Sequence, residues 1–158
     1  MKLREWLDAW SLKGLKIHAG FLDAEFAPND QDADAAWELY VELLTRATTQ
    51  LLPQDAGDEA AALESVHDLF GLTRAILRAP GRRHATGFAK IAIVVLNQKV
   101  RPFTAKWHKL QLAGLLDKPD MRADFRSELT ALQVDLRHYA GLLSQMAGVE
   151  DLTTLQSS

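Results

Sequence analysis

The sequence predicts a mainly α-helical protein, built as an antiparallel four-helix bundle with a short N-terminal helix and a short β-strand or hairpin. Three observations support this class. Leu and Ala dominate a chain of 158 residues. Apolar residues recur at helical spacing over most of its length, and short loops separate the helical stretches. A chain of this size buries about two thirds of its unfolded surface, so residues 1–158 are treated as one domain.

Residues 1–28 are expected to hold the N-terminal helix and the strand-like segment. Four apolar residues near the start have the spacing of a short amphipathic helix: Leu3, Trp6, Leu7 and Trp10. Between Leu15 and Phe26 apolar and polar residues alternate, and the phase shifts after Gly20. This pattern predicts a strand or a hairpin with a bulge, which would offer an edge for pairing with another copy or another protein.

The first two long helices follow from apolar residues at helical period. One is predicted from Ala33 to Leu51, with Asp30 or Asp32 as its cap. The other is predicted from Leu63 to Leu77, closed by the Ala-Pro-Gly sequence at residues 79–81.

The third long helix begins near Thr86 and is apolar nearly all round, which indicates the most buried helix. Pro102 removes a backbone donor and is expected to push Arg101 out of the α region, so the helix should kink or restart there. The last helix follows Pro119 and carries a seam of seven apolar residues: Phe125, Leu129, Leu132, Leu136, Tyr139, Leu143 and Met146. Residues 150–158 are expected to be a flexible tail.

Composition excludes several kinds of site. The chain has no Cys, so it has no disulfide, thiolate nucleophile or Cys-type zinc site. Its five His show no metal-ligand spacing, and no phosphate-binding glycine loop occurs, so we expect neither metal nor cofactor. The start lacks the pattern of a secretory signal, and no apolar run is long enough to span a membrane. We therefore expect a cytoplasmic protein.

Positive and negative charges are separated along the chain. Residues 70–116 contain nine Lys or Arg and no acid, whereas residues 23–68 contain twelve acids and a single base, Arg46. The basic segment either binds an anionic partner or faces its acidic neighbour within the fold. The overall pI of about 5.9 and the acidic segment argue against a nucleic-acid binder, although contact with nucleic acid stays an alternative.

Several segments together resemble a family of small bacterial helical proteins. They are AAWELYVELLTR (35–46), SVHDLFGLTRAIL (65–77), IAIVVLNQKVRPFTAKWHKL (91–110), FRSEL (125–129) and VEDLT (149–153). The resemblance covers most of residues 15–153. It implies a bacterial protein found beside conflict or antiphage genes, and it implies no particular activity.

Arg101 and His108 are the candidates for catalysis. They are seven residues apart, which places them near one face of a helix, two turns apart. An Arg followed at this spacing by a His resembles the catalytic pair of HEPN-type ribonucleases, in which the two act on the RNA phosphate as acid/base and charge stabiliser. The alternative is structural: Arg101 pairs with a carboxylate of the acidic helix, and His108 is a satisfied interfacial histidine.

Other polar residues suit an architectural role. Glu38, Glu42 and Arg46 are spaced to pair along one helix and could join bases of the later helices in a buried network. Eight residues form this candidate interaction surface or polar network: Glu38, Glu42, Arg46, Arg74, Asn97, Arg101, Trp107 and His108. Arg82 and Arg83 are candidates for anion contact at a loop tip.

These patterns favour a non-catalytic protein–protein interaction or scaffold module that associates with itself or with another protein. The alternative is an HEPN-like ribonuclease or an RNA- or anion-binding helical protein. The packing of the basic helix discriminates between them, because a basic face left open favours the second class.

Overall fold

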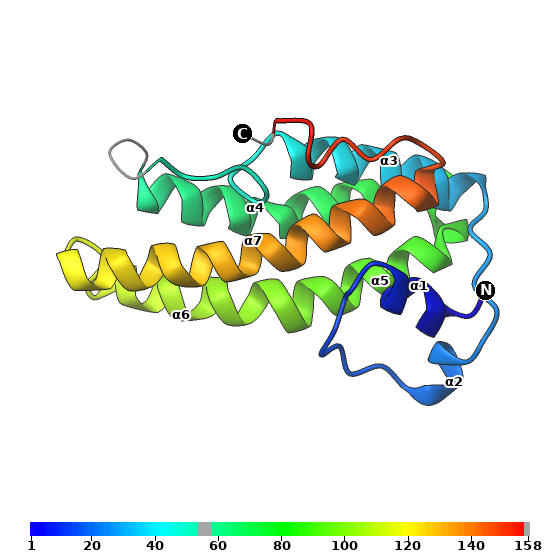
Figure 1. The fold of residues 1–158 in the computed structure, drawn as a ribbon, viewed down its shortest axis with the longest axis horizontal. Coiled ribbons are helices and arrows are strands. Elements are labelled where there is room, and N and C mark those ends of the chain that lie inside the picture. Colours follow the sequence, from blue (N-terminus) through cyan, green and yellow to red (C-terminus); the bar gives the residue numbers. More distant parts are fainter. Residues whose placement is uncertain (54–57, 157–158) are drawn as a thin grey trace.

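The computed structural model describes residues 1–53 and 58–156. The chain is mainly helical, as predicted, and its long helices lie side by side along the long axis of the molecule (Figure 1). They are α3 (Asp30–Leu44), α4 (Glu59–Arg78), α5 (Thr86–Val95) continued by α6 (Arg101–Leu112), and α7 (Pro119–Ala147). Each runs opposite to the one before it, as the colours of Figure 1 show. None of the described helices is both long and apolar enough to cross a membrane.

The N-terminal segment forms helices in place of the predicted strand. Helix α1 (Leu3–Ala9) has the predicted apolar face, but the following segment contains helix α2 (Ala19–Leu22). In the described residues, β-structure is limited to an isolated antiparallel bridge between Lys2 and Glu25. The strand prediction missed a local cap: the Nδ1 atom of His18 accepts the N–H of Gly20 at 3.1 Å and starts a helical turn. The edge on which strand pairing was expected is therefore not formed.

A tryptophan fastens the N-terminal segment to α7. The indole N–H of Trp10 donates to the side chain of Gln145 at 2.6 Å. The ring lies against Gly141, where an added Cβ would come within 2.4 Å of two ring carbons. The absence of a side chain at Gly141 is thus what allows α1 and its loop to dock.

Helix α3 begins with a capping box made by Asn29 and Asp32. The Asn29 side chain accepts the N–H of Asp32, and the Asp32 carboxylate accepts the N–H of Asn29, both at 2.9 Å. The cap is therefore Asn29, where Asp30 or Asp32 was predicted. Asp32 is buried and also accepts the N–H of Phe88 at 2.8 Å, which joins the starts of α3 and α5.

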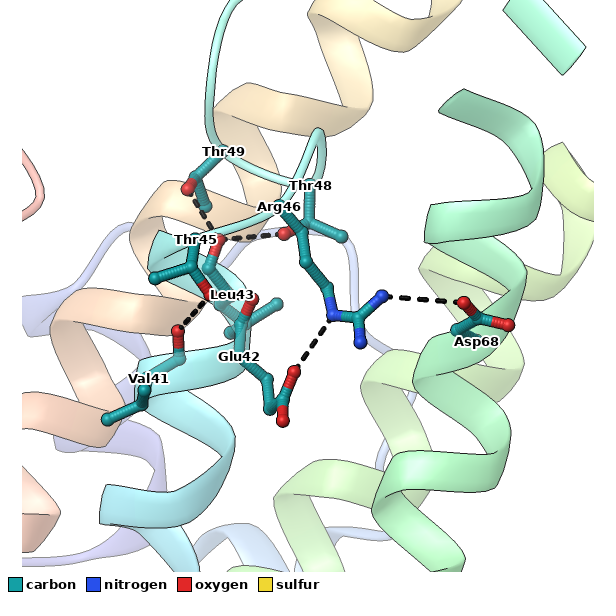
Figure 2. A network of polar contacts seen from close by, with 8 residues as sticks. All are labelled: Val41, Glu42, Leu43, Thr45, Arg46, Thr48, Thr49 and Asp68. Atoms are coloured by element: carbon teal, nitrogen blue, oxygen red, sulfur yellow. Dashed lines mark hydrogen bonds and ion pairs between the residues drawn. The ribbon is translucent and has the colours of Figure 1, made fainter. Parts of the chain in front are cut away.

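Helix α3 ends at Leu44, seven residues before the predicted end at Leu51. The hydroxyls of Thr48 and Thr49 both donate to the carbonyl of Leu43, at 2.8 and 2.6 Å (Figure 2). Side chains thereby satisfy carbonyls that a further helical turn would have used.

Helices α5 and α6 form one continuous helical segment joined by a π-helical turn, η2 (Leu96–Val100). The N–H of Arg101 donates to the carbonyl of Leu96, five residues back, and Arg101 keeps α-helical angles (φ −58°, ψ −44°). The prediction that Pro102 would move Arg101 out of the α region is therefore wrong. The wider turn accommodates a residue that has no N–H to donate.

The core follows the seam predicted on α7, and all seven of its residues are buried. Trp107 of α6 is fully buried and meets the Phe125 ring edge-on at 5.2 Å. After α7, residues 150–156 return along α3 (Figure 1), where the Tyr40 hydroxyl accepts the N–H of Leu152 at 2.6 Å. Burial raises the pKa of Tyr40, which keeps the phenol neutral and hydrogen-bonded.

Candidate functional site

A shallow pocket of about 230 Å³ lies between α4 and α6. Seven residues line it: His67, Phe70 and Arg74 from α4, and Arg101, Thr104, Ala105 and His108 from α6. Because the two helices run in opposite directions, the His67 end of α4 meets the His108 end of α6. The pocket therefore has a histidine end and an arginine end.

The histidine end consists of two imidazoles in contact. The rings of His67 and His108 lie 4.8 Å apart, centroid to centroid, in an edge-to-face arrangement. His67 is exposed and His108 is partly buried. Neither ring nitrogen has a hydrogen-bond partner among residues 1–53 and 58–156. The nitrogens of both rings are thus left open to hydrogen-bond with a bound molecule.

The arginine end is oriented by an amide and an aromatic ring. The Oδ1 atom of Asn97 accepts from Nε and Nη2 of Arg101 at 3.2 and 3.1 Å. The Arg101 guanidinium also lies over the Phe70 ring, 4.7 Å from its centroid. Arg101 was expected to pair with a carboxylate, and the structure gives it these neutral partners instead.

Arg74 has no such partner. It is exposed and makes no hydrogen bond or ion pair with another residue that the structure describes. None of the seven lining residues is acidic, so the positive charges of Arg74 and Arg101 are not neutralised inside the pocket.

The π turn of η2 helps to build this end of the pocket. Asn97 lies within the turn, and Arg101 directly follows it. The turn that accommodates Pro102 therefore also positions Asn97 and Arg101 to form their hydrogen bond. Single π turns inside α-helices occur frequently at functional sites.

The remaining candidates lie elsewhere. Glu42 and Asp68 bind Arg46 between α3 and α4, at 2.9 and 3.4 Å (Figure 2). Glu38 binds Arg82, the first residue of the short 3-10 turn η1 (Arg82–His84), at 2.7 Å. The eight residues proposed as one network are therefore divided among an α3 surface, the α4–α6 pocket and the Trp107 core.

Of the two loop-tip arginines, only one is accessible. Arg82 is 8% exposed and is turned toward Glu38, whereas Arg83 is exposed. Sequence reasoning missed His67. The signal for it was present, because His67 precedes Arg74 by seven residues, which repeats the Arg101–His108 spacing in reverse order.

No cluster of metal-ligating side chains occurs in the described part of the chain. Comparison with protein-family models, with curated proteins and with solved structures found no match. The geometry of the α4–α6 pocket is therefore the basis for inferring a function.

Proposed function

We propose that the chain is an RNA-cleaving protein whose active site is the α4–α6 pocket. The observation that carries the proposal is the convergence of two imidazoles and two guanidinium groups on one open pocket with no acidic lining residue. Guanidinium groups bind phosphate oxygens, and imidazoles are the side chains that most often act as general acids and bases, so the set matches the needs of phosphodiester cleavage.

RNA is the polymer that this set of groups can cleave without an added nucleophile. One imidazole takes the proton of the ribose 2′-hydroxyl, and the 2′-oxygen forms a bond to phosphorus. The bond from phosphorus to the 5′-oxygen breaks, and the other imidazole, initially protonated, gives its proton to that oxygen. The products are a 2′,3′-cyclic phosphate and a 5′-hydroxyl.

The arginines stabilise the charge that develops during this step. Arg74 and Arg101 line the same pocket as the two imidazoles, and Asn97 fixes the Arg101 guanidinium before any ligand arrives. Preoriented donors of this kind stabilise a transition state more than a ground state.

A cleavage assay on a single-stranded RNA with purified protein tests the proposal. Replacing His108 with Ala should lower the rate by roughly a hundredfold to ten-thousandfold, the usual contribution of an acid/base group. The matched control is His138→Ala on α7, because His138 does not line the pocket. The proposal fails if the wild-type protein produces no cyclic phosphate, or if both variants cleave equally well.

A second function, self-association as an interaction module, is favoured by a different surface. Trp37 and Val41 are 48% and 40% exposed, one helical turn apart on α3. With Leu72, Ala75 and Ile76 of α4 they line a groove of about 440 Å³. A second copy of the chain suits this groove, because the adjacent Glu38 and Glu42 are already paired with Arg82 and Arg46 and would not repel an identical surface.

Sedimentation velocity of the full chain tests this second function. Trp37→Ser should shift the protein to a smaller species if the groove forms a dimer, and Ile93→Ser provides a matched control at another exposed apolar residue. An unchanged sedimentation coefficient for Trp37→Ser would exclude the groove as the interface.

A further inference from the structure

The row of pocket residues on α4 continues beyond the arginine end of the pocket. Four exposed residues of this helix recur at the spacing of one helical face: His67, Gly71, Arg74 and Arg78. They extend over about 16 Å, since each helical residue adds about 1.5 Å. This stripe passes the arginine end of the pocket and continues to the last residue of α4.

Helix α6 carries a matching stripe in the opposite direction. Arg101, Ala105 and His108 repeat the spacing of His67, Gly71 and Arg74 with the order of the end residues reversed. In both stripes the central residue is small. On each helix, an arginine at one end and a histidine at the other thus flank a small central residue, Gly71 on α4 and Ala105 on α6.

Packing against the described part of the chain does not account for Gly71. It lies in the interior of α4, where glycine is the least favourable residue after proline. Apart from the backbone of its own helix turn and its chain neighbours, a Cβ placed there would meet no atom of the described residues within 4 Å, so packing does not require its absence. Gly141, by contrast, is required by the Trp10 ring. The space at Gly71 is open to a molecule outside the chain.

Arg78 extends the positive charge beyond the pocket. It is exposed, follows Arg74 by one helical turn and makes no ion pair with a described residue. Two like charges at this spacing destabilise a helix, and a phosphate between them would remove that cost.

From these observations we infer that the site binds an extended single strand of RNA, which runs from the histidine end across Gly71 and Ala105 to Arg74 and on to Arg78. This rests on the proposed function and adds the class and path of the substrate. A single phosphate would use only the pocket, whereas a strand of several nucleotides reaches Arg78.

Binding of 2′-O-methyl oligoribonucleotides, which have no free 2′-hydroxyl to attack, tests the path by fluorescence anisotropy. We expect Arg78→Gln to weaken binding of an octanucleotide. The salt slope, which is the magnitude of the change in log K per unit of log salt concentration, should fall by about 0.7, the value for one phosphate contact on a single strand. Binding of a dinucleotide should not change. Arg122→Gln, at an exposed arginine of α7, is the charge-matched control and should have no effect on either probe.

Gly71→Gln tests the middle of the path. The longer side chain should weaken octanucleotide binding, while the melting temperature rises because glutamine favours helix more than glycine does. Ala61→Gln adds a similar side chain at an exposed position on another face of α4 and should leave binding unchanged.

Failure of this inference differs from failure of the proposed function. If cleavage depends on His108 but octanucleotide affinity is unaffected by Arg78→Gln and Gly71→Gln, the strand does not follow α4 and the inference is overturned. If neither oligonucleotide binds the wild-type protein, the proposed function fails with it.

Discussion

Arg46 and Arg82 each bind a carboxylate of α3, whereas Arg74 and Arg101 line a pocket that contains none. Arg46 lies between Glu42 and Asp68 (Figure 2), and Arg82 is almost fully buried against Glu38. On the α3 side of the molecule these arginines are therefore neutralised: Arg46 by acids of its own acidic segment, and Arg82 of the basic segment by Glu38 of the acidic one. The lining of the α4–α6 pocket provides no such neutralisation.

Two glycines, Gly141 and Gly71, differ from one another in the same way as the two pairs of arginines: one is explained by an internal contact and the other is not. Gly141 is needed by an internal contact, and Gly71 is not. A folded chain loses free energy through like charges one helical turn apart and through glycine within a helix. On α4, no ion pair with a described residue offsets the charges of Arg74 and Arg78. Residues that internal packing explains belong to the architecture. Those that it leaves unexplained mark the surface where a ligand is expected.

The largest effect on stability is expected from Gly141→Ala. The new methyl group would overlap the Trp10 ring, and the hydrogen bond from Trp10 to Gln145 would break as the ring moved. Overpacking of this kind destabilises by about 2 kcal/mol, even after the gain in helix propensity. Urea unfolding monitored by circular dichroism measures the loss. A variant as stable as the wild type would show that the two glycines do not differ.

Arg82→Gln should have the next largest effect. The change removes a guanidinium hydrogen bond of 2.7 Å to Glu38. Because Glu38 is half exposed, water can hydrate its carboxylate in place of Arg82. We expect a loss of about 1.5 kcal/mol, near the lower end for hydrogen bonds to charged groups. Arg83→Gln changes the neighbouring exposed arginine and should leave the free energy of unfolding within about 0.5 kcal/mol of the wild type. Equal losses in the two variants would contradict the assignment of Arg82 to the architecture.

Periodicity was sufficient to predict the helices, because each long helix buries an apolar face at helical spacing. The apolar period predicted α7 together with the seven apolar residues of its seam, all of which are buried. It was not sufficient where side chains bond to nearby backbone: His18 starts a helical turn in the predicted strand, and Thr48 and Thr49 end α3 early. Alternating apolar residues carry no information about such caps.

The candidate site was predictable only in part. Arg101 and His108 lie on the same face of α6, and their spacing in the sequence indicates that they act together. His67 and Arg74 are about thirty residues away in the sequence, and only the antiparallel packing of α4 against α6 brings them to the same pocket. The partners of Arg101 were also not predictable, because they depend on the π turn at Asn97 and on the position of Phe70.

Gly71→Ala should change stability in the direction opposite to Gly141→Ala. The methyl group would meet no atom of another described element within 4 Å, and alanine is favoured over glycine in a helix interior by about 1 kcal/mol. Urea unfolding should therefore show a gain of about that size. A loss of stability would mean that Gly71 is required by the fold, and its use as a marker of the RNA path would then be unfounded.

The smallest effect on stability is expected from the double variant Arg74→Gln, Arg101→Gln, and this prediction separates the two regions most sharply. The variant loses the contact of Arg101 with the Phe70 ring and its exposed hydrogen bonds to Asn97, but it also removes two positive charges that no carboxylate of the pocket lining balances. The free energy of unfolding should stay within about 1 kcal/mol of the wild type. Octanucleotide affinity should nevertheless fall, and its salt slope should decrease by about 1.4, since each phosphate contact on a single strand contributes about 0.7.

The matched control is Arg46→Gln, because Arg46 is already neutralised by Glu42 and Asp68 and should contribute nothing to RNA binding. If the double variant lost several kcal/mol of stability while the RNA affinity of the folded protein stayed intact, Arg74 and Arg101 would belong to the architecture, like Arg82, and the contrast between the two regions would disappear.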